Sequence, residues 1–300
     1  MSAKHNPLKK IIKHSLQQFA ASYGRHTRPG SEPELLVLMY HRILPEDDKR
    51  VVLEEPGMMV APDTLTIHIN TIKQYVEIIK LSRWIQLKST GAELPERACV
   101  ITFDDGWADN YEYAFPVLQA LEVPATIYLV ADMIGTNIKF WPERLAQTLA
   151  TIAEHHAGQW SHPSLDWIKQ AHTSYQFTTL PPTQDELSEL IASAKELSDE
   201  DIHARLDHIN EELHLPAANN TPSLLNWEQI AEMAASAYVE FGSHTCSHIR
   251  LGADTPADVL EHEILASKQT IETHTQQPVS TFCFPNGDYS PQALELVRNN

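Results

Sequence analysis

Two short stretches of the sequence combine residue types that can hold a cation. Asp104 and Asp105 follow directly after an apolar run at 99–103. His244 and His248 lie four positions apart, after another apolar run. Two imidazoles at this spacing can reach one cation from a single helical turn. With one carboxylate they form a ligand set that suits Zn²⁺ or a similar metal and leaves positions open for water.

Each half of this pattern also has a plainer explanation. An Asp at the end of a strand often caps the following helix, although only one of two adjacent Asp residues can be the cap. The chain contains 16 His residues, so a His-x-x-x-His pair alone is a weak signal. We therefore give weight to the combination, since both stretches follow apolar runs of strand length.

The surrounding pattern alternates strands with helices. Strands are expected at the apolar runs 35–40, 99–103, 124–130, 238–241 and 279–284, with a further short strand at 84–87. Helical periodicity fits 63–79, 107–121, 226–230 and 261–273. This order predicts a parallel sheet in a barrel-like α/β fold. Ligands bind at the carboxyl edge of such a sheet, where Asp104, Asp105 and His244 should meet.

A helical insertion is expected at about 134–222, within a domain that covers 31–300. The stretches 141–153 and 185–213 have helical periodicity, and the second is rich in Asp and Glu. We expect a lid or a partner surface without a core of its own.

Charge separates the first 30 residues from the rest. Residues 1–30 carry six basic and no acidic side chains, a charge of +6. Because the net charge of the whole chain is −18, the remaining residues carry −24. This acidic balance argues against nucleic acid as a partner. The basic segment could form an amphipathic helix on an anionic membrane surface, or pack on the domain. No export signal or membrane-spanning run is visible, so we expect a cytoplasmic protein, with peripheral contact at the inner face of the membrane as the alternative.

Three stretches together resemble a known family. The sequences at 102–106, 243–248 and 282–287 are similar to the first three motifs of the polysaccharide deacetylases (NodB-homology domain, carbohydrate esterase family four). The resemblance runs from about residue 35 to the carboxyl end, except for the insertion. It implies a distorted (β/α)7 barrel that removes acetyl groups from sugars with one divalent metal ion.

The resemblance also implies roles for individual residues. The metal ligands would be Asp105, His244 and His248, and the general base would be Asp104. The ion would be Zn²⁺, with Fe²⁺, Co²⁺ or Ni²⁺ as alternatives. The backbone near Pro285 and Asn286 would contact the substrate. Trp107 could stack on a sugar ring, although its helical spacing also fits a core position.

Two departures from the family pattern stand out. Cys283 occupies the place where many members have an Arg that contacts the base. The family's general-acid His normally lies near the carboxyl end, but the sequence reaches Asn300 before such a strand. His41 follows the run at 35–40 with the same Leu-x-x-His character, as in circularly permuted relatives, so we expect His41 to be the acid. The alternatives are a hydrogen-bonded strand-end His and a chain truncated at its carboxyl end.

The sequence therefore predicts a metal-dependent deacetylase of an N-acetylated oligosaccharide or polysaccharide, or of a lipid-linked sugar. One alternative is a catalytically silent carbohydrate-binding or scaffold protein of the same fold. Another metal hydrolase, such as a phosphoesterase, is disfavoured because a single Asp-His-His set lacks the second metal of many such enzymes.

Overall fold

A computed structural model describes residues 32–155, 162–171, 182–216 and 221–300 of the chain. The basic segment at 1–30, with its expected amphipathic helix, lies outside these residues.

The centre of the fold is a parallel sheet. Its strands run in the order β1 (Glu34–Tyr40), β5 (Arg97–Phe103), β6 (Ala125–Leu129) and β7 (Val239–Ser243). The short strand β4 (Glu77–Ile78) pairs with Ala98 and Cys99 near the start of β5. All of these pairings are parallel, which confirms the predicted α/β class.

Strand β5 shows why the chain folds this way. Its residues from Ala98 to Phe103 are buried, as expected for a strand with a neighbour on each edge and apolar groups on both faces. A smaller pair of strands, β2 (Arg42–Ile43) and β3 (Met59–Val60), follows β1.

The sheet does not close into a ring within the described residues. The strand expected at 279–284 is reduced to a single parallel bridge between Phe282 and Ser243. Pro278 and Pro285 flank this segment, and a proline has no N–H to donate to a ladder. The segment still exchanges two backbone hydrogen bonds with Ser243, which keep it beside β7.

Strand β1 forms the other end of the sheet. Among the described residues it pairs only with β5, and its second edge is open. Three of its large apolar side chains are therefore exposed: Leu36 by 46%, Val37 by 53% and Met39 by 58%.

Helices cover the sheet. They are α2 (Pro62–Ile72), α3 (Leu81–Thr90), α4 (Phe115–Leu121), α9 (Trp227–Ala235), α10 (Ala257–Glu261), α11 (Ser267–Thr275) and α12 (Pro291–Asn299). The strand expected at 84–87 was wrong, because these residues lie inside α3. Gly91 ends that helix in the left-handed conformation, and Trp84 packs on Ala98 and Val100 of β5.

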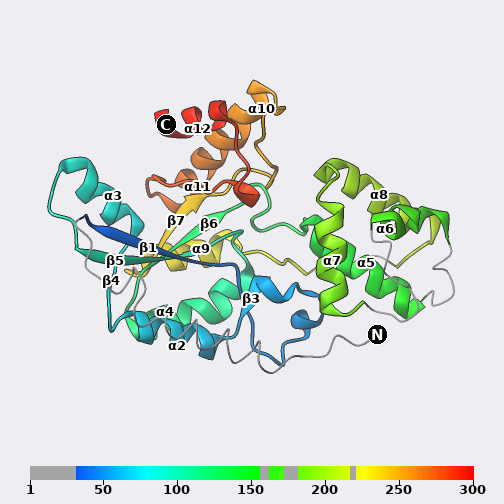
Figure 1. Ribbon diagram of the computed structural model, residues 1–300, viewed down its shortest axis with the longest axis horizontal. Coiled ribbons are helices and arrows are strands. Elements are labelled where there is room, and N and C mark those ends of the chain that lie inside the picture. Colours follow the sequence, from blue (N-terminus) through cyan, green and yellow to red (C-terminus); the bar gives the residue numbers. More distant parts are fainter. Residues whose placement is uncertain (1–31, 156–161, 172–181, 217–220) are drawn as a thin grey trace, which may run out of the picture.

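The insertion forms a helical unit at one side of the molecule, at the right in Figure 1. It consists of α5 (Trp141–His155), α6 (Asp166–Ala171), α7 (Gln184–Ala194) and α8 (Asp199–Glu212). Contrary to our expectation, these helices enclose a buried cluster of their own, which includes Leu145, Leu149, Leu190, Ile202 and Leu206. The acid-rich sequence hid this core, since the apolar positions lie on only one face of α7 and α8.

Among the helices of the described residues, none combines the length and the apolar character that a membrane crossing needs.

The buried insertion core leads to a stability prediction. Leu206 is fully buried in this cluster. We expect Leu206→Ala to lower the free energy of unfolding by about 3 kcal/mol, because it removes apolar contacts and leaves a cavity. Urea denaturation followed by circular dichroism measures this change. Ile67→Ala on α2, where the side chain is 62% exposed, is the control and should be nearly neutral. An equal loss in both variants would contradict a packed insertion core.

Candidate active site

The exit of β5 places two carboxylates side by side. Asp104 N donates to Tyr40 O at 2.9 Å, so the ladder with β1 continues one residue beyond the strand. Asp105 then adopts φ 74° and Gly106 adopts φ 76°, which turns the chain sharply. This positive φ favours glycine at position 106, where a Cβ atom would also lie 2.8 Å from Leu129 Cδ2.

The exit of β7 supplies two imidazoles from a tight turn, where the spacing had predicted a helical turn. Thr245 and His248 both have positive φ, and His248 N donates to Thr245 Oγ1 at 2.8 Å. Glu263 accepts hydrogen bonds from Cys246 N at 2.8 Å and Ser247 N at 3.0 Å. These bonds hold the loop in a strained shape that turns both His side chains inward.

The three expected metal ligands converge on one point. The Nε2 atoms of His244 and His248 each lie 3.3 Å from Asp105 Oδ1. This oxygen is buried and accepts no hydrogen bond of good geometry from the described residues. His244 Nδ1 lies 2.8 Å from Cys283 O, which fixes the tautomer with Nε2 free to bind a cation.

This arrangement fits a divalent metal ion. Ligand atoms about 2 Å from a tetrahedral zinc ion lie about 3.3 Å from one another. The donor set of two nitrogens and one oxygen suits Zn²⁺, and it also suits Fe²⁺, Co²⁺ or Ni²⁺. The unpartnered oxygen of Asp105 is the kind of buried polar atom that a cation would satisfy.

Electrostatics agree with separate roles for the two carboxylates. Burial opposes ionisation of Asp105, but the two imidazoles outweigh it and hold its pKa well below the usual range. Burial raises the pKa of Asp104, and the neighbouring charge of Asp105 raises it further. His244 is also buried, yet its contact with Asp105 raises its pKa well above the ordinary value.

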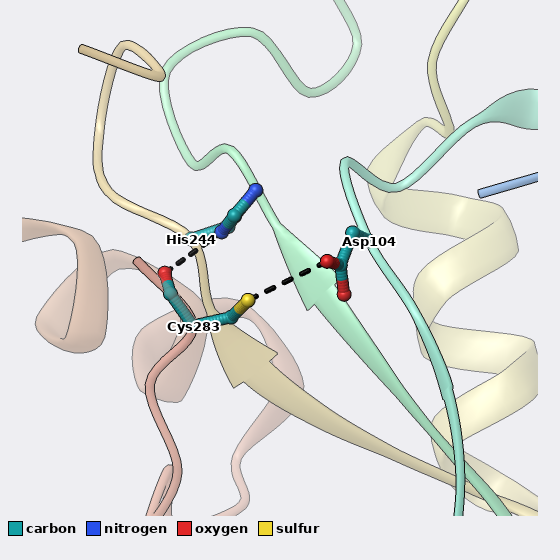
Figure 2. Close-up of side chains that lie close together, drawn as sticks. All are labelled: Asp104, His244 and Cys283. Carbon is teal, nitrogen blue, oxygen red and sulfur yellow. Dashed lines mark hydrogen bonds between the residues drawn. The ribbon is translucent and has the colours of Figure 1, made fainter. Parts of the chain in front are cut away.

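Cys283 lies between Asp104 and His244, as Figure 2 shows. Its thiol lies 3.5 Å from Asp104 Oδ2 as a weak donor, while its carbonyl contacts His244. Asp104 Oδ1 has no hydrogen-bond partner among the described residues. In many members of the family that the sequence resembles, a cationic Arg occupies this position. This chain has a neutral thiol there, which does little to oppose the raised pKa of Asp104.

A cleft of about 520 Å³ opens above these groups. His41 and Asn286 line it together with Asp104, Asp105 and both His ligands. Burial raises the pKa of Asp104 and of Glu55, and the imidazole of His41, which lies near both carboxyl groups, offsets part of that rise.

Two of the expected substrate contacts, Pro285 and Trp107, expose little surface to a ligand. Pro285 is buried and does not line the cleft, whereas its neighbours Asn286 and Gly287 do. Trp107 lines the cleft, but it is only 4% exposed, and its indole Nε1 donates to Asp105 Oδ2 at 2.9 Å. Arg42 and Phe140 contact its ring, so a sugar cannot stack there without displacing them.

The insertion supplies one wall of the cleft, through Trp141, Glu143 and Lys195. Arg250 anchors it: its guanidinium donates to Lys195 O at 2.9 Å and to Leu197 O at 2.7 Å, at the end of α7. Because Arg250 follows His248 by two residues, the insertion is tied directly to the loop that carries the expected ligands.

Sequence reasoning missed Glu263, which is 4% exposed and supports the His loop. A signal was present, since Glu263 lies on the apolar face between Leu260 and Ile264, both buried. A carboxylate at a core position needs partners, and here they are backbone N–H groups of the loop.

Known proteins are similar to this chain in fold and in sequence. The deacetylase PplD of Streptococcus pyogenes, solved in complex with acetate, matches with a TM-score of 0.52 and 17% identity over 89% of this chain and 81% of that chain. IcaB of Ammonifex degensii gives the same values. Both likenesses show the fold alone, and PplD, by its name a deacetylase, is one protein that has it.

The sequence defines the family. The chain belongs to the polysaccharide deacetylase family, whose model matches residues 91–213 and 208–300. YxkH of Bacillus subtilis, whose name places it among the polysaccharide deacetylases, is 29% identical over 57% of this chain and 53% of its own length. The poly-beta-1,6-N-acetyl-D-glucosamine N-deacetylase of Staphylococcus epidermidis is 29% identical over 34% of this chain and 38% of its own length. The matched part of this chain thus spans about half or less of the length of each of these two relatives.

The raised pKa of His244 leads to a prediction about metal binding. A proton must leave this imidazole before Nε2 can bind a cation. At pH values below that pKa, we therefore expect the affinity for Zn²⁺ to increase about tenfold for each unit by which the pH is raised. Competition with a chromophoric chelator over about pH 5 to 8 measures it. His208→Ala, at an exposed site, should behave as the unmodified chain, and His244→Ala should bind weakly throughout. An affinity that does not change with pH would contradict this ligand assignment.

Proposed function

We propose that this protein is a metal-dependent deacetylase that removes N-acetyl groups from a glycan. The observation that carries the proposal is the convergence of Asp105 Oδ1 with the Nε2 atoms of His244 and His248, beside the separate carboxylate of Asp104 and inside a cleft. Membership of the polysaccharide deacetylase family supports it.

The substrate we propose is a polymer of N-acetylglucosamine. Relatives from Staphylococcus epidermidis and Escherichia coli are named for poly-beta-1,6-N-acetyl-D-glucosamine, and the acetylated amine of that sugar is the group that such a site would hydrolyse. A lipid-linked sugar and a membrane contact through residues 1–30 are further proposals that rest on the sequence alone.

Asp104 would act as the general base. A zinc ion held by the three ligands would polarise the acetyl carbonyl and lower the pKa of a bound water. The unpartnered Oδ1 of Asp104 would take a proton from the water as its oxygen adds to the acetyl carbon. The raised pKa of Asp104 makes it a stronger base than an ordinary Asp once it is ionised.

His41 would act as the general acid. As the carbon–nitrogen bond breaks, the leaving amine needs a proton, and His41 lines the cleft near Asp104. The products are acetate and a sugar with a free amine. A backbone N–H near Asn286 would help to stabilise the negative charge that develops on the carbonyl oxygen.

One observation favours a second candidate, a silent glycan-binding member of the family. Cys283 leaves Asp104 without the cationic neighbour that many members have. Tight glycan binding with no acetate released from any acetylated sugar would support this alternative over the deacetylase.

The acid–base pair gives the central test. We expect Asp104→Asn to lower acetate release at least a hundredfold while zinc still binds, because only the proton acceptor is lost. His41→Ala should lower kcat by a similar factor, since the amine then leaves without a proton. Acetate released from N-acetylglucosamine oligosaccharides is measured, with zinc content as the second readout. Asp63→Asn, at an exposed position, is the control. Full activity in Asp104→Asn would refute the mechanism.

Two substitutions of Cys283 should shift the pH dependence of kcat/KM in opposite directions. The base works only when it is ionised, so kcat/KM should fall as the pH drops through its pKa. Cys283→Arg would place a cation beside Asp104, lower its pKa and move this acidic limb about one to three pH units lower. Cys283→Ala would remove the thiol donor and move the limb higher. A pH–rate profile of both variants measures the shifts, and the same shift in both would rule out Asp104 as the titrating base.

A further inference from the structure

The two oxygens of Asp105 have different surroundings. Oδ1 faces the imidazoles of His244 and His248, each at 3.3 Å. Oδ2 accepts a hydrogen bond of 2.9 Å from Trp107 Nε1. Because a carboxylate can rotate about its Cβ–Cγ bond, a fixed donor on one oxygen determines the direction in which the other points.

The Trp107 ring is itself held in place by Arg42. The guanidinium carbon of Arg42 lies 4.2 Å from the ring centroid, a cation–π contact inside the protein. The side chain of Arg42 is 5% exposed and bonds to two carboxylates. Its Nε and Nη2 each lie 2.9 Å from Asp109 Oδ2, and its Nη1 pairs with Glu54. The planar guanidinium therefore has one orientation, and so has the indole stacked on it.

The same cluster also holds the segment that carries His41. Asp109 Oδ1 accepts a hydrogen bond of 2.7 Å from Ile43 N. Asn110 Nδ2 donates to His41 O at 2.9 Å. Asp109 and Asn110 follow Asp105 by only a few residues, so these bonds tie the exit of β1 to the exit of β5.

Stability alone does not explain this cluster. A buried ion pair is expensive to desolvate and is often matched by apolar residues of similar volume. Arg42 and Asp109 are both buried, and they lie against groups with expected chemical roles on either side. What charged residues add over an apolar contact is direction, since each hydrogen bond fixes an angle as well as a distance.

We propose that Arg42 is a positioning residue that acts on both halves of the site. Through Trp107 it directs Asp105 Oδ1 toward His244 and His248, and through Asp109 it fixes the backbone beside His41. The inference rests on the proposed function in taking Asp105 as a metal ligand and His41 as the acid.

The first test removes the indole N–H. Trp107→Phe keeps an aromatic ring beneath Arg42 but leaves Asp105 Oδ2 without its donor. We expect the Kd for Zn²⁺ to rise about ten- to hundredfold, as is usual when a group that orients a ligand is lost. The visible absorption of the Co²⁺-loaded protein should shift as well. Trp84→Phe makes the same chemical change in a separate apolar cluster and should alter neither readout.

The second test asks whether Arg42 acts through Trp107. Arg42→Lys keeps a charge for Asp109 and Glu54 but loses the planar stack. Alone it should weaken zinc binding by a smaller factor than Trp107→Phe, and it should lower kcat with little change in KM. In the Trp107→Phe background it should weaken zinc binding no further, because the route to Asp105 is already broken.

Thermal unfolding by circular dichroism verifies that each variant is folded. Wild-type zinc affinity and an unchanged Co²⁺ spectrum in Trp107→Phe would overturn the proposal. Equal effects of Arg42→Lys on zinc affinity in both backgrounds would also overturn it. The zinc affinity and the Co²⁺ spectrum do not depend on acetate release. If the unmodified chain binds zinc but releases no acetate, the deacetylase function fails while the metal measurements still decide the role of Arg42.

Discussion

The structure depends on one electrostatic problem, the burial of two adjacent carboxylates at the end of β5. Asp104 and Asp105 are each 4% exposed, and two like charges so close together in a protein interior repel each other. The left-handed turn at Asp105 gives the two side chains different neighbours: one meets two imidazoles and the other meets a thiol and an open cleft. A cation beside Asp105 would neutralise one charge and leave the other to accept a proton.

The rest of the fold brings the partners of these carboxylates into place. Parallel pairing delivers the exits of β1, β5 and β7 to one edge, because all of the strands point the same way. The insertion adds a wall that the sheet cannot supply, and Arg250 couples that wall to the His248 loop. The helical unit, with a core of its own, can therefore vary in sequence and alter the shape of the cleft without disturbing the β5 turn.

The sequence was most informative where chemistry and strand exits coincide. Asp105, His244 and His248 lie together in the structure as expected from the sequence, since buried apolar runs reveal strands and the parallel order reveals their shared edge. Residues 84–87 were assigned to a strand because a run of four mostly apolar residues is too short to distinguish the strand period of 2.0 residues from the helix period of 3.6. Arg42 and Asp109 were given no role because their contact joins segments distant in sequence, which no local pattern encodes.

The open edge of β1 has a consequence for how the site moves. Within the described part of the chain β1 is hydrogen-bonded on one side only, with Val37 and Met39 exposed. Such a strand opens locally at a lower free-energy cost than a strand paired on both sides. Its amide protons should exchange with solvent sooner than those of β5 and β6. The site then has a firm part, around Asp105 and His244 and at the His41 backbone held by Asn110, and a softer margin along β1 at Met39. A long glycan arriving over Met39 would meet the part of the cleft that can adjust to it.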